Sequence, residues 1–140
     1  MNWMGYALLS ALFAAITAIL AKIGVKNIDS NLATAIRTVV ILVFAWSIVF
    51  FQGTTKQIGS ISRYSLLFLV LSGIATGLSW LFYFRALQLG TASQVSAIDK
   101  LSLVFTLILA ILILKERVTP QIITGIVFMS LGAILISSSR

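Results

Sequence analysis

The chain has 140 residues, of which 60% are hydrophobic and only 9% are charged, and its formal net charge is +7. So few charges cannot cover the surface of a soluble domain, in which about a quarter of the residues are charged, so we expect lipid to be the main solvent. Because the chain has no His, no Cys and only three acidic residues, it lacks imidazole bases, thiol nucleophiles and most zinc ligands, and we predict neither an enzyme nor a cofactor.

Five apolar segments are long enough to cross about 30 Å of hydrocarbon, which takes roughly 20 residues of helix. Polar or glycine-containing stretches such as "KNIDSN" and "QGTTKQIGSIS" separate them. The sequence therefore predicts an all-α membrane protein with five transmembrane helices in a single domain, residues 1–140. The expected helices are Trp3–Gly24, Leu32–Phe51, Tyr64–Leu89, Ser93–Leu114 and Pro120–Ser138.

The first segment starts with "MNWM", without the basic residues that open a secretory signal, so we expect a retained helix. Small residues form a stripe along it that permits close helix contact, which we expect within one subunit. The stripe comprises Ser10, Ala14, Thr17, Ala21 and Gly24.

The third segment carries a polar stripe at steps of four, three and four residues, which is one face of a helix. It comprises Ser72, Thr76, Ser79 and Tyr83, with Gly73, Gly77, Trp80 and Phe84 beside it. Two interpretations remain open. The glycines and hydroxyls can serve helix packing, or the stripe can line a cavity in which Trp80 and Tyr83 contact a ligand.

The fourth segment holds adjacent charges in "SAIDKLSLVF", with Asp99, Ser102 and Thr106 on one helical face and Lys100 about a quarter turn away. Counted from the neighbouring turns, Arg37 and Arg85 lie at a similar depth. A charge at the centre of a spanning helix costs about 2.5–3.5 kcal/mol, so these four residues must find partners or water.

Two arrangements would accommodate the charges. Asp99 can form a structural bridge with Arg37 or Arg85. Alternatively, the basic residues border a vestibule that attracts an anionic or carboxylate-bearing substrate, with Asp99 as a gate or proton site. Arg85 and Lys100 can also extend to the membrane surface.

The last segment begins at Pro120, a favourable first residue of a helix, and spaces Gly125 and Gly132 one heptad apart. Such spacing suits close packing against another membrane helix. We predict that these two glycines contribute to a dimer contact.

Basic residues are distributed almost evenly between the two faces of the membrane, whereas a strong bias would fix orientation. Four lie on each side near the helix ends: Lys56, Arg63, Lys115 and Arg117 on one, Lys22, Lys26, Arg85 and Arg140 on the other. An odd number of helices places the termini on opposite faces. Two copies inserted in opposite orientations would then form an inverted-repeat transporter, although insertion in a single orientation remains an alternative.

Because the basic residues are dispersed along the chain and do not form one patch, we expect no nucleic-acid partner.

Three stretches resemble the EamA-type repeat of the drug/metabolite transporter superfamily. They are "ATAIRTVVIL" with Arg37, "WLFYFRALQLGTASQVSAIDKLS", and "LKERVTPQIITGIVFMSLGAILI" with its Glu116–Arg117 pair. The resemblance covers nearly the whole chain and is greatest with the small five-helix bacterial and archaeal branch. It implies half of a ten-helix inverted-repeat transporter, here an antiparallel homodimer, in a bacterial or archaeal cytoplasmic membrane.

The chain departs from this family in two respects. Many relatives have a proline where this chain has Ala97, which puts a kinked gate in doubt. The first helix lacks the glutamate of the smaller multidrug relatives, which disfavours polyaromatic-cation export by that route.

The resulting hypothesis is transport of a small metabolite by alternating access. The alternative is a non-transporting membrane subunit or a component of a lipid-carrier flippase. The candidate cavity residues are Trp80, Tyr83, Ser79, Thr76, Ser72, Ser102 and Thr106, and the gating or charge network comprises Asp99, Arg37, Arg85 and Lys100.

Overall fold

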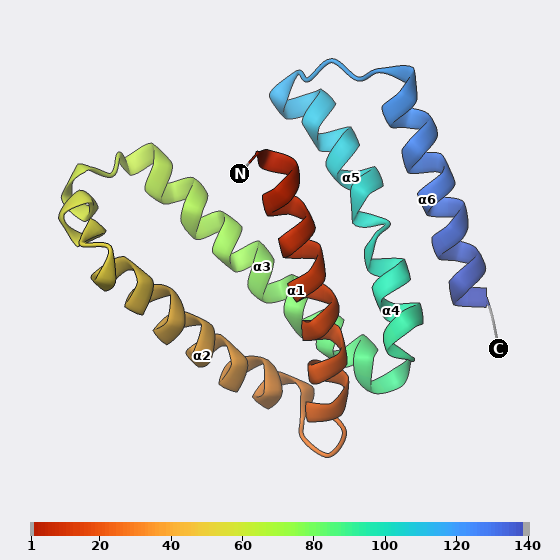
Figure 1. Ribbon diagram of the computed structural model, residues 1–140, viewed down its shortest axis with the longest axis horizontal. Coiled ribbons are helices and arrows are strands. Elements are labelled where there is room, and N and C mark those ends of the chain that lie inside the picture. The colour runs from red at the N-terminus through yellow and green to blue at the C-terminus, as the bar shows by residue number, and fades with distance from the viewer. Residues whose placement is uncertain (1, 139–140) are drawn as a thin grey trace. The chain divides into compact units, whose positions relative to one another are not determined.

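The computed structural model describes residues 2–138, and helices make up most of them (Figure 1). Five helical spans are long and apolar enough to cross a membrane, which confirms the predicted all-α membrane fold. They are α1 (Trp3–Gly24), α2 (Ser30–Phe51), α3 (Arg63–Leu89), the interrupted span Ala92–Leu114 and α6 (Pro120–Ser138).

Helix ends follow local chemistry. The Asp29 carboxylate accepts hydrogen bonds from the backbone N–H groups of Asn31 and Leu32 at 2.9 and 3.1 Å. This cap starts α2 at Ser30, two residues before the predicted start, because it satisfies N–H groups that have no partner in the first helical turn. One of the three acids thus has a structural role at the helix end.

The connection after α2 turns at Gly53, whose φ of +66° is a left-handed conformation that glycine adopts without strain. A short 3₁₀ helix, Thr54–Ser60, follows and leads to α3. The stretch predicted as a polar turn therefore contains one compact helical segment.

The fourth span is interrupted at the charged pair, which the sequence pattern did not indicate. It consists of α4 (Ala92–Asp99), α5 (Ser102–Leu109) and a π-helical end, Ala110–Leu114. Across the interruption the Lys100 N–H donates to the Ala97 carbonyl and the Leu101 N–H to the Ile98 carbonyl. These bonds reach back three residues instead of four, so a tight 3₁₀-type turn replaces the α-helix. No proline or glycine stands there.

The described chain divides into two compact units. The first is continuous in sequence, Ala21–Gln88, and contains the end of α1, all of α2 and nearly all of α3. The second combines the residues up to Leu20 with those from Leu89 onward. Within it, α6 packs mainly against α4.

Few side chains are buried, and most of them lie in the 21–88 unit. Val25, Phe84 and Leu87 are at most 2% exposed, and the buried polar residues are Ser30 and Thr34. These residues come from the loop after α1, the start of α2 and the end of α3, so the best-packed region is where these three segments meet. Most other large apolar side chains are exposed, as expected for helices that face lipid or another membrane helix.

Candidate functional site

Side-chain hydrogen bonds to backbone carbonyls tie the end of α1 to the end of α3. Gln88 Nε2 donates to the carbonyls of Val25 at 3.1 Å and Ile28 at 2.6 Å. Lys22 Nζ donates to the Leu87 carbonyl. Leu87 lies in the last turn of α3, where carbonyls lack partners within their own helix, and Val25 and Ile28 lie in the connection after α1. The two side chains supply hydrogen-bond donors to these carbonyls. We call Lys22, Val25, Ile28, Leu87 and Gln88 the helix-end junction.

Arg85 lies beside the helix-end junction and is exposed. Its Nη1 donates to Gln88 Oε1 at 3.0 Å, so it orients the amide that holds the carbonyls. The sequence interpretation had placed Arg85 in a charge network or at the membrane surface. Sequence reasoning did not identify Lys22 and Gln88 as members of a contact. The one signal for it is that a lysine and a glutamine stand in the last turns of two otherwise apolar spans.

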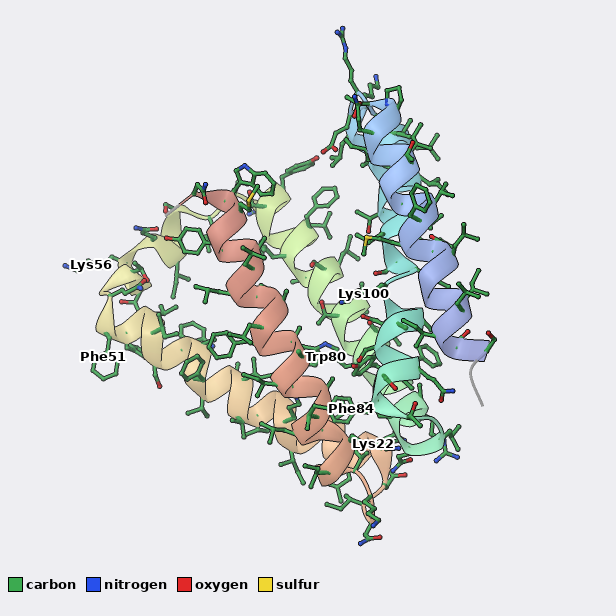
Figure 2. All side chains as sticks on the ribbon, turned by 45° about the vertical axis from the view of Figure 1, so that its right-hand side comes forward. Lys22, Phe51, Lys56, Trp80, Phe84 and Lys100 are labelled. Atoms are coloured by element: carbon green, nitrogen blue, oxygen red, sulfur yellow. The ribbon has the colours of Figure 1, made fainter. Side chains whose placement is uncertain are left out.

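Arg37 lies on α2 with its guanidinium over two aromatic rings of α3. The guanidinium carbon is 4.6 Å from the ring centroid of Trp80 and 5.2 Å from that of Phe84. Trp80 and Phe84 are one turn apart on α3, and Phe84 is only 2% exposed. Figure 2 shows both rings, with Lys22, at the end of the unit away from Phe51 and Lys56. We call Arg37, Trp80 and Phe84 the arginine–aromatic cluster.

The two rings stabilise the Arg37 charge only in part. A cation over an aromatic face gains about 0.5–1 kcal/mol when exposed and about 2 kcal/mol when desolvated, whereas a central membrane charge costs about 2.5–3.5 kcal/mol. Within residues 2–138 no hydrogen bond or ion pair reaches the guanidinium. Its five N–H donors therefore have no hydrogen-bond acceptor among the described residues.

Only Tyr83 of the polar stripe on α3 is half-buried, while Ser72, Thr76 and Ser79 are exposed. The Thr76 hydroxyl donates to the Ser72 carbonyl at 2.9 Å, within its own helix. Such a bond satisfies a hydroxyl in lipid without another helix. Whether this stripe lines a cavity stays a prediction.

The glycines next to the stripe have open space at their Cα atoms among the described residues. A Cβ atom built on Gly73 or Gly77 would meet no atom within 4 Å among the described residues. The same is true of Gly125 and Gly132 on α6. These faces have room for a neighbouring helix, and the predicted dimer contact at α6 stays a prediction.

Asp99 is the last residue of α4 and forms an ion pair with Lys100 at 3.8 Å, with both side chains largely exposed. The interruption separates it from Ser102 and Thr106 on α5, both exposed. Whether Asp99 shares a helical face with Ser102 and Thr106 across the interruption stays a prediction. A bridge from Asp99 to Arg37 or Arg85 would join residues of different units and stays a prediction.

Comparison with known proteins identifies the relationship that the sequence suggested. Residues 1–138 match the EamA-like transporter family. The chain is 48% identical over 136 residues to a Sinorhizobium sp protein described as "Uncharacterized transporter in cobO 3'region", a match that covers 97% of this chain and 96% of that protein. No solved structure matches the chain. The family match covers almost the whole length of the chain, and the chain has five helices able to span a membrane. This multi-pass membrane protein therefore belongs to the EamA-like transporter family.

Proposed function

We propose that this chain is half of a transporter that moves a small metabolite across a bacterial or archaeal cytoplasmic membrane by alternating access. The observation that carries the proposal is the family match over residues 1–138. In addition, the five spans bury very few of their side chains within the described chain. Without a hydrophobic driving force between helices in lipid, stable bundles depend on close packing. The exposed faces of this chain are consistent with a second subunit.

An antiparallel homodimer would supply that subunit. Transporters with inverted repeats place their substrate site where the two halves meet, near the middle of the bilayer. Five spans and four basic residues near the helix ends on each face allow the same chain to insert in both orientations, because the bias of basic loops sets orientation. In this arrangement Trp80 and Tyr83 contact substrate, and Asp99 with Arg37 organises or gates the path.

Thiol labelling tests the orientation directly, because the chain contains no cysteine and each single-cysteine variant has one reactive site. Gly59→Cys lies between α2 and α3, and Thr91→Cys lies between α3 and α4, at opposite ends of α3. In intact cells we expect a membrane-impermeant maleimide to label about half of each variant. Labelling of one variant only would refute the antiparallel homodimer.

Transport itself is tested with the purified protein in proteoliposomes loaded with a mixed metabolite extract. We expect selective, time-dependent exchange of at least one solute, absent from protein-free vesicles. If no solute exchanges from correctly folded, reconstituted protein, the transporter proposal fails and the alternative of a non-transporting subunit is favoured.

A further inference from the structure

Apart from Arg63, the first residue of α3, four basic residues lie inside the spans, and three of them have polar partners. Lys22 donates to a backbone carbonyl and Arg85 to the Gln88 amide. Lys100 pairs with the neighbouring carboxylate. Arg37 differs from these three, because its described neighbours are the aromatic residues Trp80 and Phe84, with Tyr83 nearby.

From this arrangement we infer that Arg37 is a substrate-binding residue for an oxyanion, and that the transported solute is a small organic anion carrying a carboxylate or phosphate group. The inference rests on the proposed transport function and specifies its substrate class. A guanidinium presents its N–H groups in a plane that matches the two oxygens of a carboxylate or phosphate, so one residue can bind the group through two hydrogen bonds.

The aromatic rings prepare the guanidinium for this role. The guanidinium carbon lies 4.6 Å from the Trp80 ring centroid and 5.2 Å from that of Phe84, and neither ring has an oxygen that could accept its N–H groups. Because Phe84 is buried next to Leu87 of the helix-end junction, the platform under the guanidinium is anchored. A side chain already ordered in its bound geometry loses less entropy when an anion arrives.

Trp80 provides a local reporter of binding. The chain has three tryptophans, so the double variant Trp3→Phe/Trp46→Phe leaves Trp80 as the only indole. An anion that binds the stacked guanidinium should change the emission of this indole. The matched control, Trp3→Phe/Trp80→Phe, keeps only Trp46, which contacts Phe50 on α2 and should not respond.

The probes are lactate, succinate, benzoate and inorganic phosphate, titrated at constant ionic strength into the protein in neutral detergent, with lactamide, succinamide and benzamide as uncharged counterparts. We expect a saturable change of Trp80 emission with at least one anion and none with its amide. In the same background Arg37→Gln should weaken binding at least about tenfold, the scale of one charge-assisted hydrogen bond. Arg63→Gln, which removes the same charge from the exposed first residue of α3, should leave it unchanged.

The acid–amide comparison requires no change at Arg37, so the inference stays falsifiable if Arg37→Gln does not fold. Equal responses to acids and amides, no response to any anion, or undiminished binding in folded Arg37→Gln would each overturn the inference. Nanodiscs of phosphatidylglycerol and of phosphatidylcholine identify a lipid source. If phosphatidylglycerol alone changes Trp80 emission and blocks the soluble anions, the oxyanion is a headgroup and the solute assignment is wrong.

Binding in detergent needs no gradient and no transport. Anion binding without solute exchange in proteoliposomes would contradict the proposed function but keep the oxyanion site. Solute exchange that is unaffected by Arg37→Gln would contradict this inference and leave the transport function intact.

Discussion

Gln88→Ala should destabilise the protein, because it removes the amide that bonds two carbonyls across the helix-end junction. The lost contacts are those from Gln88 Nε2 to the Val25 carbonyl at 3.1 Å and the Ile28 carbonyl at 2.6 Å. Polar contacts between membrane helices average about 0.6 kcal/mol and reach about 1.7 kcal/mol, while a typical hydrogen bond contributes about 1 kcal/mol. We therefore expect a loss of about 1–2 kcal/mol in the free energy of unfolding.

The assay is reversible unfolding by sodium dodecyl sulfate in mixed micelles, followed by far-ultraviolet circular dichroism. Gln57→Ala is the matched control, since Gln57 is exposed on the short 3₁₀ helix, and it should change stability by less than about 0.5 kcal/mol. Gln88→Met keeps the side-chain length but has no donor, so it should lose nearly as much as Gln88→Ala. A Gln88→Met protein as stable as the wild type would refute the reasoning, because packing rather than hydrogen bonding would then hold the junction.

Three further predictions concern the arginine–aromatic cluster, the α6 face and the polar stripe. In a double-mutant cycle of unfolding, Arg37→Gln and Trp80→Leu should couple by about 0.5–2 kcal/mol, and zero coupling would show that the ring does not stabilise the charge. Gly132→Leu should reduce self-association measured by cross-linking in membranes, whereas Gly59→Leu on the short 3₁₀ helix should not. Equal dimer yields would place the contact elsewhere. Thr76→Val should change stability and solute exchange little, since its hydroxyl bonds its own helix; a selective loss of exchange would favour the cavity-lining interpretation.

The sequence alone predicted the spans well, because their length and apolar composition follow directly from bilayer thickness. The bounds of α1 and α6 are those expected, and α2 differs only through the Asp29 cap. The interruption after Asp99 was not predicted. It contains neither proline nor glycine, and an adjacent acid and base do not by themselves signal a change from four-residue to three-residue hydrogen bonds.

The contacts of the candidate site were harder to predict than its members. The sequence places Arg37 on one span and Trp80 and Phe84 on another, and it leaves Arg37 with two alternatives, a bridge to Asp99 or a vestibule for an anion, without indicating the contact with the rings. Gln88 and Ile28 lie 60 positions apart in the chain. Helical periodicity defines the face of each span but not which faces of different spans meet, so single-sequence reasoning could not pair them.

The division of the chain also has a consequence for biosynthesis. Ala21–Gln88 is an unbroken stretch, so all the partners of the helix-end junction have been synthesised once Gln88 has been translated. Residues 89–140 follow over roughly 3–10 s at about 5–20 residues per second, and only then can α6 meet α4. The arginine–aromatic cluster can therefore assemble in the nascent chain while the membrane insertion machinery is still handling the C-terminal helices.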